Sequence, residues 1–305
     1  MKIKKTILAL MLILLVVAFC GCGDKDYETE KVNSEKVQIT TKNTPEQIIL
    51  AHLAAIIIEE KTVHEVEIEE KENISSKSLY NDLKDGNIDL YFDYTGSIYL
   101  NALGLPKEDM QNAVLLTQLQ KLLIEKDVYL SESVGYDGGM TLYMTPEVRE
   151  SLKDPIYISD LKTLAPKLKI GMEESFFQRK SGYKALEKTY ELQFGKAKVY
   201  TEDEGFLALR RGDIDIMVGS RTSVYNNMYN LYLFRDDKRF FINEDACFVA
   251  KDSYLLEYPE IKNALGTFDN LITSGTMSIL IRKTYVEGND MDTYLRDFLR
   301  ARNLM

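Results

Sequence analysis

Two short stretches of this chain repeat one local pattern, and each joins the end of a predicted helix to a short apolar strand. They are LKDGNIDL over 83–90 and LRRGDIDI over 209–216. Gly86 and Gly212 stand where a helix ends in a left-handed residue, a conformation that glycine adopts without steric cost. Two matched helix–glycine–strand units predict two α/β lobes of similar construction. Clefts between such lobes commonly hold small ligands.

The rest of the chain alternates predicted strands with predicted helices. The motif at Thr44–Pro45–Glu46–Gln47 has the residue types of a capping box with proline at the first helical position, and a second box begins at Thr201. A longer helical stretch is predicted over 107–126. This alternation indicates an α/β fold with parallel or mixed sheets that are covered on both faces.

The N-terminal segment has the layout of a secretory signal. Three lysines among the first five residues precede an apolar run over 7–19, and Gly21 and Cys22 follow. The pair resembles the cleavage site of bacterial lipoproteins, whose cysteine is lipidated. We therefore predict a signal peptide over 1–21, a lipid on Cys22 and a flexible tether over 22–36. The alternative is an uncleaved N-terminal anchor; both place the body of the chain outside the cytoplasmic membrane.

Composition and charge exclude several functional classes. The formal net charge is −10, and loss of the signal peptide would make it more negative, which argues against binding nucleic acid. With Cys22 lipidated and Cys20 removed, Cys247 is the last cysteine, so neither a disulfide framework nor a thiolate metal site is expected. The two histidines lack metal-ligand spacing, and we predict no metal and no cofactor.

Nothing in the sequence points to a particular reaction. It contains no Gly-x-Ser-x-Gly, no His-Glu-x-x-His and no suggestive cysteine–histidine pair. Two of the many carboxylates could still converge as in a glycosidase, so a hydrolase remains the less favoured alternative.

Five segments together resemble one protein family in order and spacing. The segments are VQITTKNTPEQIIL from Val37, GNIDLYFDYTGS from Gly86, APKLKIG from Ala165, FFQRKSGY from Phe176 and DDKRFF from Asp236. The chain resembles, from about residue 37 to its C-terminus, the substrate-binding proteins of ABC transporters for glycine betaine, choline and carnitine.

The resemblance implies a type II periplasmic-binding-protein fold with a hinged cleft between two α/β lobes. We expect the first lobe to comprise 37–142 and 247–305, the second to comprise 143–246, and crossovers near 140–144 and 245–249. Such a protein would be lipid-anchored on the extracytoplasmic face, bind a small cationic or zwitterionic ligand and deliver it to an ABC permease with its ATPase. A lipoprotein that senses its ligand is the main alternative.

The resemblance also implies cations for a ligand carboxylate. Lys42, with Asn43 beside it, precedes the first long helix, and Arg179 lies in Phe-Phe-Gln-Arg, at the positions where the family places such groups. A solvated loop lysine and a structural ion pair of Arg179 are the alternatives.

The family's aromatic cage for a quaternary ammonium is only partly matched. Tyr94 occupies one cage position, with Thr95 next to it, whereas Met140, Ser220 and Glu244 replace three other rings. A buried carboxylate favours a partner that carries charge and N–H donors.

The chain is therefore expected to bind a cationic head that bears N–H groups, through Glu244. In the alternative, Glu244 is a hinge residue that caps a helix or pairs with Arg221 or Arg239. A shift of register would restore other rings to the cage: Tyr136, Tyr143 or Tyr225.

Overall fold

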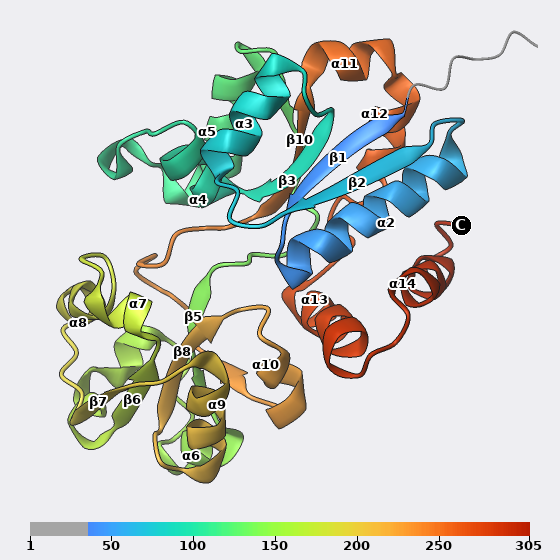
Figure 1. Ribbon diagram of the computed structural model, residues 1–305. Coiled ribbons are helices and arrows are strands. Elements are labelled where there is room, and N and C mark those ends of the chain that lie inside the picture. Colours follow the sequence, from blue (N-terminus) through green and yellow to red (C-terminus); the bar gives the residue numbers. More distant parts are fainter. Residues whose placement is uncertain (1–35) are drawn as a thin grey trace, which may run out of the picture. The chain divides into compact units, whose positions relative to one another are not determined.

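The computed structural model describes residues 36–305, which belong to one compact unit (Figure 1). The predicted signal peptide over 1–21, the lipidation site Cys22 and the tether up to Glu35 lie outside the described residues. Lys36 already pairs with a strand of the first sheet, with 2.9 Å between its Nζ and Oε2 of Glu67. No helix within 36–305 has the length and apolar character to cross a membrane.

The first sheet has five strands in the order β2-β1-β3-β10-β4. β1 runs parallel to β2 and β3, and β10 is antiparallel to β3 and β4. The strands are β1 (Val37–Lys42), β2 (Val66–Lys71), β3 (Leu90–Tyr94), β4 (Val128–Leu130) and β10 (Ala246–Lys251).

The second sheet has five strands in the order β7-β6-β8-β5-β9. β6 runs parallel to β7 and β8, and β5 is antiparallel to β8 and β9. The strands are β5 (Met140–Met144), β6 (Lys169–Met172), β7 (Lys196–Val199), β8 (Ile216–Ser220) and β9 (Tyr232–Leu233).

The two sheets match position by position. In each, three parallel strands are followed by an antiparallel strand from another part of the chain and then by a short edge strand. The predicted fold class, two α/β lobes of the periplasmic-binding type, is thereby confirmed.

The chain passes between the sheets slightly before the predicted positions. Met140 pairs with Ser220 in the second sheet, and Ala246 pairs with Tyr94 in the first. Residues 140–142 were assigned to the first lobe and Ala246 to the second, so these assignments were wrong. The reason is that 140–144 and 246–251 are sheet strands themselves, and the crossings precede them.

Helices cover both sheets (Figure 1). The helices that pack with the first sheet are α2 (Pro45–Lys61), α3 (Ser76–Asp85), α4 (Thr95–Ser97), α5 (Leu115–Ile124), α11 (Asp252–Glu257), α12 (Pro259–Gly266), α13 (Ser274–Ile281) and α14 (Met291–Arg300). The second half adds α6 (Pro146–Ser151), α7 (Glu174–Gln178), α8 (Tyr183–Tyr190), α9 (Glu202–Arg211) and α10 (Val224–Tyr229). Short segments of 3-10 or π-helix are η1 (Ile98–Ala102), η2 (Lys107–Asp109), η3 (Asn112–Val114), η4 (Ile158–Thr163), η5 (Ala165–Lys167) and η6 (Arg282–Val286).

The repeated sequence pattern forms the same structure twice. Gly86 ends α3 at φ 78° and Gly212 ends α9 at φ 77°, as their spacing predicts. Three residues later Asp89 accepts a hydrogen bond from the backbone N–H of Gln38 at 2.8 Å, and Asp215 accepts one from Lys169 at 2.7 Å. Each repeat therefore fastens its strand to the first residues of the neighbouring parallel strand.

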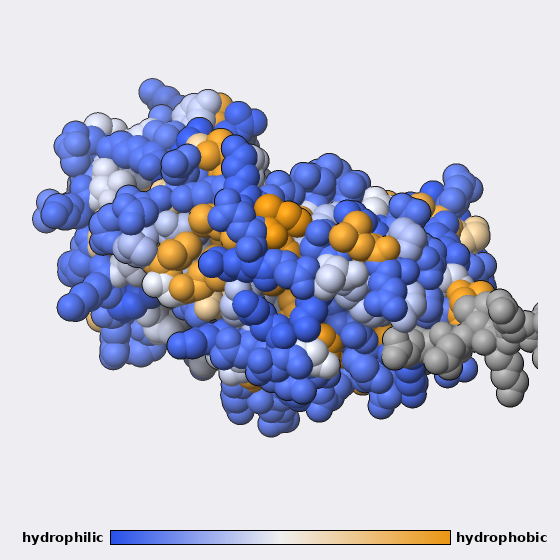
Figure 2. Space-filling view, turned by 90° about the horizontal axis from the view of Figure 1, so that it is seen from above, coloured by the Kyte–Doolittle hydropathy of each residue, from blue (hydrophilic) through white to orange (hydrophobic). Residues whose placement is uncertain are grey.

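Alternation along the central strands puts apolar side chains on both faces of each sheet. In β3, Leu90 and Phe92 pack with α2 and the C-terminal helices, whereas Tyr91 packs with α3 and α5. β8 does the same, with Ile216 and Met217 on opposite faces. The surface seen in Figure 2 is mainly hydrophilic, with apolar residues in separate patches.

Candidate functional site

The parallel strands of both sheets end at two neighbouring cavities. β1 ends at Lys42, β3 at Tyr94 and β8 at Ser220, and all three residues line the larger cavity, of about 520 Å³. Ligands of open α/β sheets bind outside the carboxyl ends of the strands. Gly138, in the crossing between the sheets, lines this cavity and also a smaller one of about 320 Å³.

Glu46 joins the two halves of the larger cavity. It lies in the first turn of α2, and its carboxylate accepts hydrogen bonds from the hydroxyls of Tyr94 in the first sheet and Thr222 after β8. The Thr222 hydroxyl also lies 2.7 Å from that of Ser220. Burial raises the pKa of Glu46, although the two hydroxyl donors oppose the shift.

A second carboxylate faces the same cavity from the other half of the chain. Glu202 begins α9, and its Oε1 accepts a hydrogen bond of 2.8 Å from the hydroxyl of Ser223. Burial also raises the pKa of Glu202. The Tyr225 ring lines the cavity as well, and it stacks on Phe206 with 5.0 Å between ring centroids. The cavity thus combines two carboxylates, of which Glu46 is partly buried and Glu202 is solvent-accessible, with the rings of Tyr94 and Tyr225.

Lys42 lines the larger cavity, but its charge is already paired. Its Nζ lies 2.8 Å from Oδ1 of Asp93 and 2.9 Å from the hydroxyl of Ser76. The Asp93 side chain is fully buried, and its Oδ1 also accepts the backbone N–H of Tyr94 at 2.9 Å. Lys42 is therefore neither the solvated loop lysine of the alternative reading nor an unpaired cation.

The smaller cavity holds Arg179, Met140 and Glu244. Arg179 Nη2 lies 3.3 Å from the Met140 sulfur, and its guanidinium lies 4.9 Å from the centroid of the Phe176 ring. Partial burial lowers the pKa of Arg179. Within 36–305 no carboxylate lies at ion-pair distance from it, so the structural ion pair given as the alternative does not form there, and the guanidinium can take an anionic group.

Glu244 holds the return crossing against the turn that follows β3. Its Oε2 accepts the backbone N–H of Ser97 at 3.0 Å, which corresponds to the predicted alternative of a helix cap. Gly96 is required for this contact, because a Cβ there would lie 2.3 Å from Ile242 Cγ2 and 2.9 Å from Glu244 Cδ. Burial raises the pKa of Glu244 to about 7, and repulsion from Asp93 and Asp137 adds to the shift.

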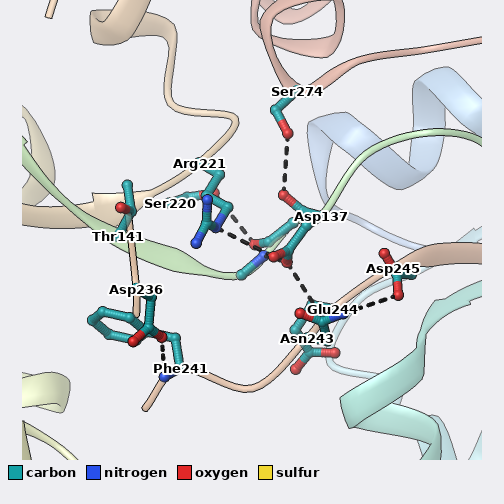
Figure 3. A network of polar contacts seen from close by, with 12 residues as sticks. Asp137, Thr141, Ser220, Arg221, Asp236, Phe241, Asn243, Glu244, Asp245 and Ser274 are labelled. Carbon is teal, nitrogen blue, oxygen red and sulfur yellow. Dashed lines mark hydrogen bonds and ion pairs between the residues drawn. The ribbon is translucent and has the colours of Figure 1, made fainter. Parts of the chain in front are cut away.

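Asp137 organises the crossing beside Glu244, as Figure 3 shows. Its Oδ1 accepts the backbone N–H groups of Gly139 at 2.7 Å and Glu244 at 3.1 Å, and its Oδ2 lies 3.2 Å from Arg221 Nε. The Asp137 carbonyl accepts the hydroxyl of Ser274 at 3.3 Å. Arg221 therefore pairs with Asp137 and not with Glu244.

Two of the predicted site residues line neither cavity. Asn43 is exposed, and its backbone N–H is bonded to the carbonyl of Lys71. Thr95 is fully buried, donates its hydroxyl to the carbonyl of Asn243 at 2.9 Å and accepts the N–H of Asp245 at 3.0 Å. Neither residue therefore belongs to the lining of these two cavities.

The rings that a register shift would restore lie at different depths. Tyr136 is buried behind Tyr94, edge-on at 6.4 Å between centroids, and Tyr143 is buried with its hydroxyl on the carbonyl of Ser220. Tyr225 is the member of this group that lines the larger cavity.

The sequence reasoning missed Glu46, Glu202 and Thr222. Glu46 lies inside a sequence that predicts a capping box. The box does not form, because Thr44 makes no side-chain cap and Gln47 Oε1 instead accepts the N–H of Lys42 at 3.4 Å. A usable signal was present, because Glu46 and Glu202 each stand in the first turn of a helix that directly follows a parallel strand.

Residues 35–301 match the family model described as the substrate binding domain of ABC-type glycine betaine transport system. The carnitine transport binding protein OpuCC of Listeria monocytogenes is 25% identical over 314 residues, covering 98% of each chain. The ergothioneine transport permease/ergothioneine binding protein EgtU of Helicobacter pylori is 24% identical over 275 residues, covering 90% of this chain and 49% of that protein.

A solved structure supports the same assignment. The crystal structure of a glycine betaine/carnitine/choline ABC transporter protein superposes with a TM-score of 0.80 at 25% identity, and the match covers 88% of this chain and 99% of that one. The chain belongs to the family of substrate-binding domains of ABC-type glycine betaine transport systems.

Proposed function

We propose that this chain captures a small zwitterion and presents it to an ABC permease, with the cationic head of the ligand in the larger cavity. The observation that carries the proposal is the grouping of two carboxylates, the partly buried Glu46 and the solvent-accessible Glu202, with the rings of Tyr94 and Tyr225 around one space of about 520 Å³. Rings stabilise a cation through their faces, and carboxylates do so through charge.

The carboxylates favour a head that donates hydrogen bonds. Burial destabilises the charged forms of Glu46 and Glu202, and a desolvated cation between them would offset that cost. A primary or secondary ammonium, a guanidinium or an imidazolium supplies both charge and N–H donors, whereas a quaternary ammonium supplies charge alone. The N–H-bearing head predicted from the sequence is retained, with Glu46 and Glu202 in place of Glu244 as its partners.

The tail of the ligand is assigned to the smaller cavity. Arg179 is a half-buried guanidinium without an ion-pair partner in the described part of the chain, and it lies beyond Gly138, which both cavities share. Guanidinium groups bind carboxylates in bidentate fashion. The relatives named for carnitine and for ergothioneine support a zwitterionic ligand, since both compounds carry a carboxylate and a cationic nitrogen.

Thermal unfolding with matched ligand pairs tests the proposal. We would compare carnitine with norcarnitine, and choline with dimethylethanolamine, because each pair differs by one N-methyl group. Glycine betaine, ergothioneine, agmatine and amino acids complete the panel. A ligand at 100 times its dissociation constant adds about 2.7 kcal/mol. Larger shifts with the N–H members support the proposal, and larger shifts with the quaternary members contradict the assignment of Glu46 and Glu202.

Glu46→Gln is expected to weaken a cationic ligand about tenfold, or about 1.4 kcal/mol, because the amide keeps the shape of the side chain but loses its charge. Isothermal titration with the best ligand of the panel measures the effect. The control is Asp203→Asn, which removes the same charge from an exposed residue of the same cavity. An equal loss in both variants would mean that general charge, and not contact with Glu46, determines affinity.

Tyr94→Ala is expected to weaken a cationic ligand by about 0.5–2 kcal/mol, because the ring face contributes a cation–π interaction. Tyr94→Phe keeps the ring and loses only the hydroxyl bound to Glu46, so a smaller loss is expected. Titration of both variants separates the two roles. If phenylalanine is as damaging as alanine, the hydroxyl is the functional group.

The proposal assigns no reaction to the chain, in agreement with a family that binds substrates for transport. Recovery of the ligand unchanged after prolonged incubation, measured by mass spectrometry, checks this point. Uptake of labelled ligand by cells that lack the chain distinguishes transport from sensing, since a sensor would leave uptake intact. We also propose a lipid anchor at Cys22, and Cys22→Ser is expected to release the protein from membranes.

A further inference from the structure

A third cavity, of about 420 Å³, lies where the two crossings between the sheets meet. Three arginines line it: Arg221 after β8, and Arg235 and Arg239 on the return crossing. Asn112 and Asn243 line it as well. None of these residues lines the 520 Å³ cavity, so this space is separate from the proposed site of the cationic head.

Both carboxylates that line this cavity already have partners within the chain. Asp137 is held by Arg221 and by two backbone N–H groups, as described above. Asp236 accepts the backbone N–H groups of Phe240 at 3.0 Å and Phe241 at 2.7 Å, and also the hydroxyl of Tyr190. Figure 3 shows Asp236 directed at the backbone of Phe241. Neither carboxylate therefore forms an ion pair with Arg235 or Arg239.

Arg235 and Arg239 have no ion-pair partner within residues 36–305, although eleven other arginines and lysines do pair there. Both are exposed. Arg239 has a left-handed backbone, with φ 53°, which is uncommon for a residue with a side chain. This conformation closes the turn that begins at Asp236, where the N–H of Arg239 bonds to the Asp236 carbonyl at 3.3 Å. The turn keeps Arg239 at the cavity while Asp236 is occupied by the backbone.

We propose that this cavity binds a small divalent oxyanion of the phosphate and sulfate class between Arg235 and Arg239. Planar guanidinium groups match the oxygen geometry of such anions, and charge-assisted hydrogen bonds are roughly twice as strong as neutral ones. Three guanidinium groups and the two carboxylates of Asp137 and Asp236 line the cavity, so its lining keeps a net positive charge that favours an anion. The site does not depend on which cation the larger cavity holds.

The position of the site gives the anion a second effect. The cavity is lined by Asn112, which belongs to the first half of the chain, and by Arg221 and Phe234, which flank strands of the second sheet. An anion there would contact the return crossing itself. Binding of the anion and of the transported ligand would then be coupled, and by linkage each would change the affinity of the other by the same factor.

Isothermal titration of the full chain with sodium phosphate, at an ionic strength held constant with sodium chloride, tests the proposal. Saturable binding to the unmodified chain is expected, with at least a tenfold loss of affinity in Arg235→Gln/Arg239→Gln. Both side chains are exposed, so the fold is expected to persist, and circular dichroism verifies it.

Lys238→Gln is the matched control, because Lys238 is an exposed cation between the two arginines that instead donates to the carbonyl of Thr189 at 2.8 Å. Retained phosphate affinity in this variant supports the site. An equal loss in the control, phosphate binding that survives the double substitution, or no saturable binding at all would overturn the proposal. A phosphate-dependent change in ligand affinity measures the coupling separately.

Discussion

Replacing Lys42 with methionine is expected to lower the free energy of unfolding by about 3–5 kcal/mol, because the substitution leaves the buried Asp93 carboxylate without its cation. The Asp93 side chain is fully buried and its Oδ1 lies 2.8 Å from the ammonium. Chemical denaturation at neutral pH measures the loss. The double variant Lys42→Met/Asp93→Asn is expected to recover a large part of it, since no uncompensated charge then remains.

Lys71→Met is the matched control for this experiment. Lys71 ends β2 directly beside Lys42 at the end of β1, and its ammonium pairs with Glu69 at 3.0 Å on the surface. Exposed pairs contribute about 0–1 kcal/mol, so this variant is expected to lose little stability. If Lys42→Met loses no more than Lys71→Met, the ion pair with Asp93 has no structural importance, and Lys42 is available for the carboxylate of a ligand.

Glu244→Gln is expected to change how stability depends on pH. The pKa of Glu244 is about 7 in the folded chain against 4.5 for an ordinary glutamate, so the folded state binds the proton more tightly than the unfolded state. The contribution of this group to stability is therefore complete below pH 4.5 and is lost as the pH rises from 4.5 to 7. The difference amounts to about 3 kcal/mol, at about 1.4 kcal/mol for each pH unit.

Denaturation curves of the two proteins between pH 4.5 and pH 8 measure this difference. The unmodified chain is expected to lose about 3 kcal/mol relative to Glu244→Gln across the interval. Glu132→Gln, at an exposed residue, is expected to leave the profile of the unmodified chain unchanged. Parallel profiles for the unmodified chain and Glu244→Gln would show that the carboxylate is hydrated and titrates normally.

The parts of the fold that depend on local chemistry could be predicted from the sequence. Gly86 and Gly212 end their helices as expected because few other residues adopt a left-handed conformation without strain. The capping box at Thr201 forms, with Glu204 N–H donated to the Thr201 hydroxyl. Repetition of these local signals was sufficient to indicate two similar sheets.

Other features depend on contacts between segments that are distant in the sequence, and local sequence patterns could not predict them. The helix predicted over 107–126 becomes regular only at Leu115, because Gln118 bonds through its side chain to the N–H of Gln111 and the carbonyl of Asp109. The partner of Lys42 is 51 residues away in the sequence. Glu46 meets Thr222 across 176 residues, and no local pattern distinguishes such a carboxylate from a helix-capping one.

The cage positions illustrate the same limit. Met140 and Ser220 face each other in neighbouring strands, as register partners, yet they line different cavities. Glu244 lies in the smaller cavity, on the side of Arg179. The alignment with the family places these residues in one ring around the ligand, whereas in the structure they line two cavities that share Gly138.

The late position of β10 in the sequence determines the order in which the two sheets can be completed as the chain folds. All strands of the second sheet lie between residues 140 and 233, so that sheet has every strand once this segment has emerged. The first sheet lacks a central strand until 246–251 arrive, and until then β3 and β4 expose unpaired backbone edges. A chain truncated before residue 246 would retain one complete sheet and one divided sheet, so the C-terminal fifth of the molecule is expected to determine its resistance to proteases.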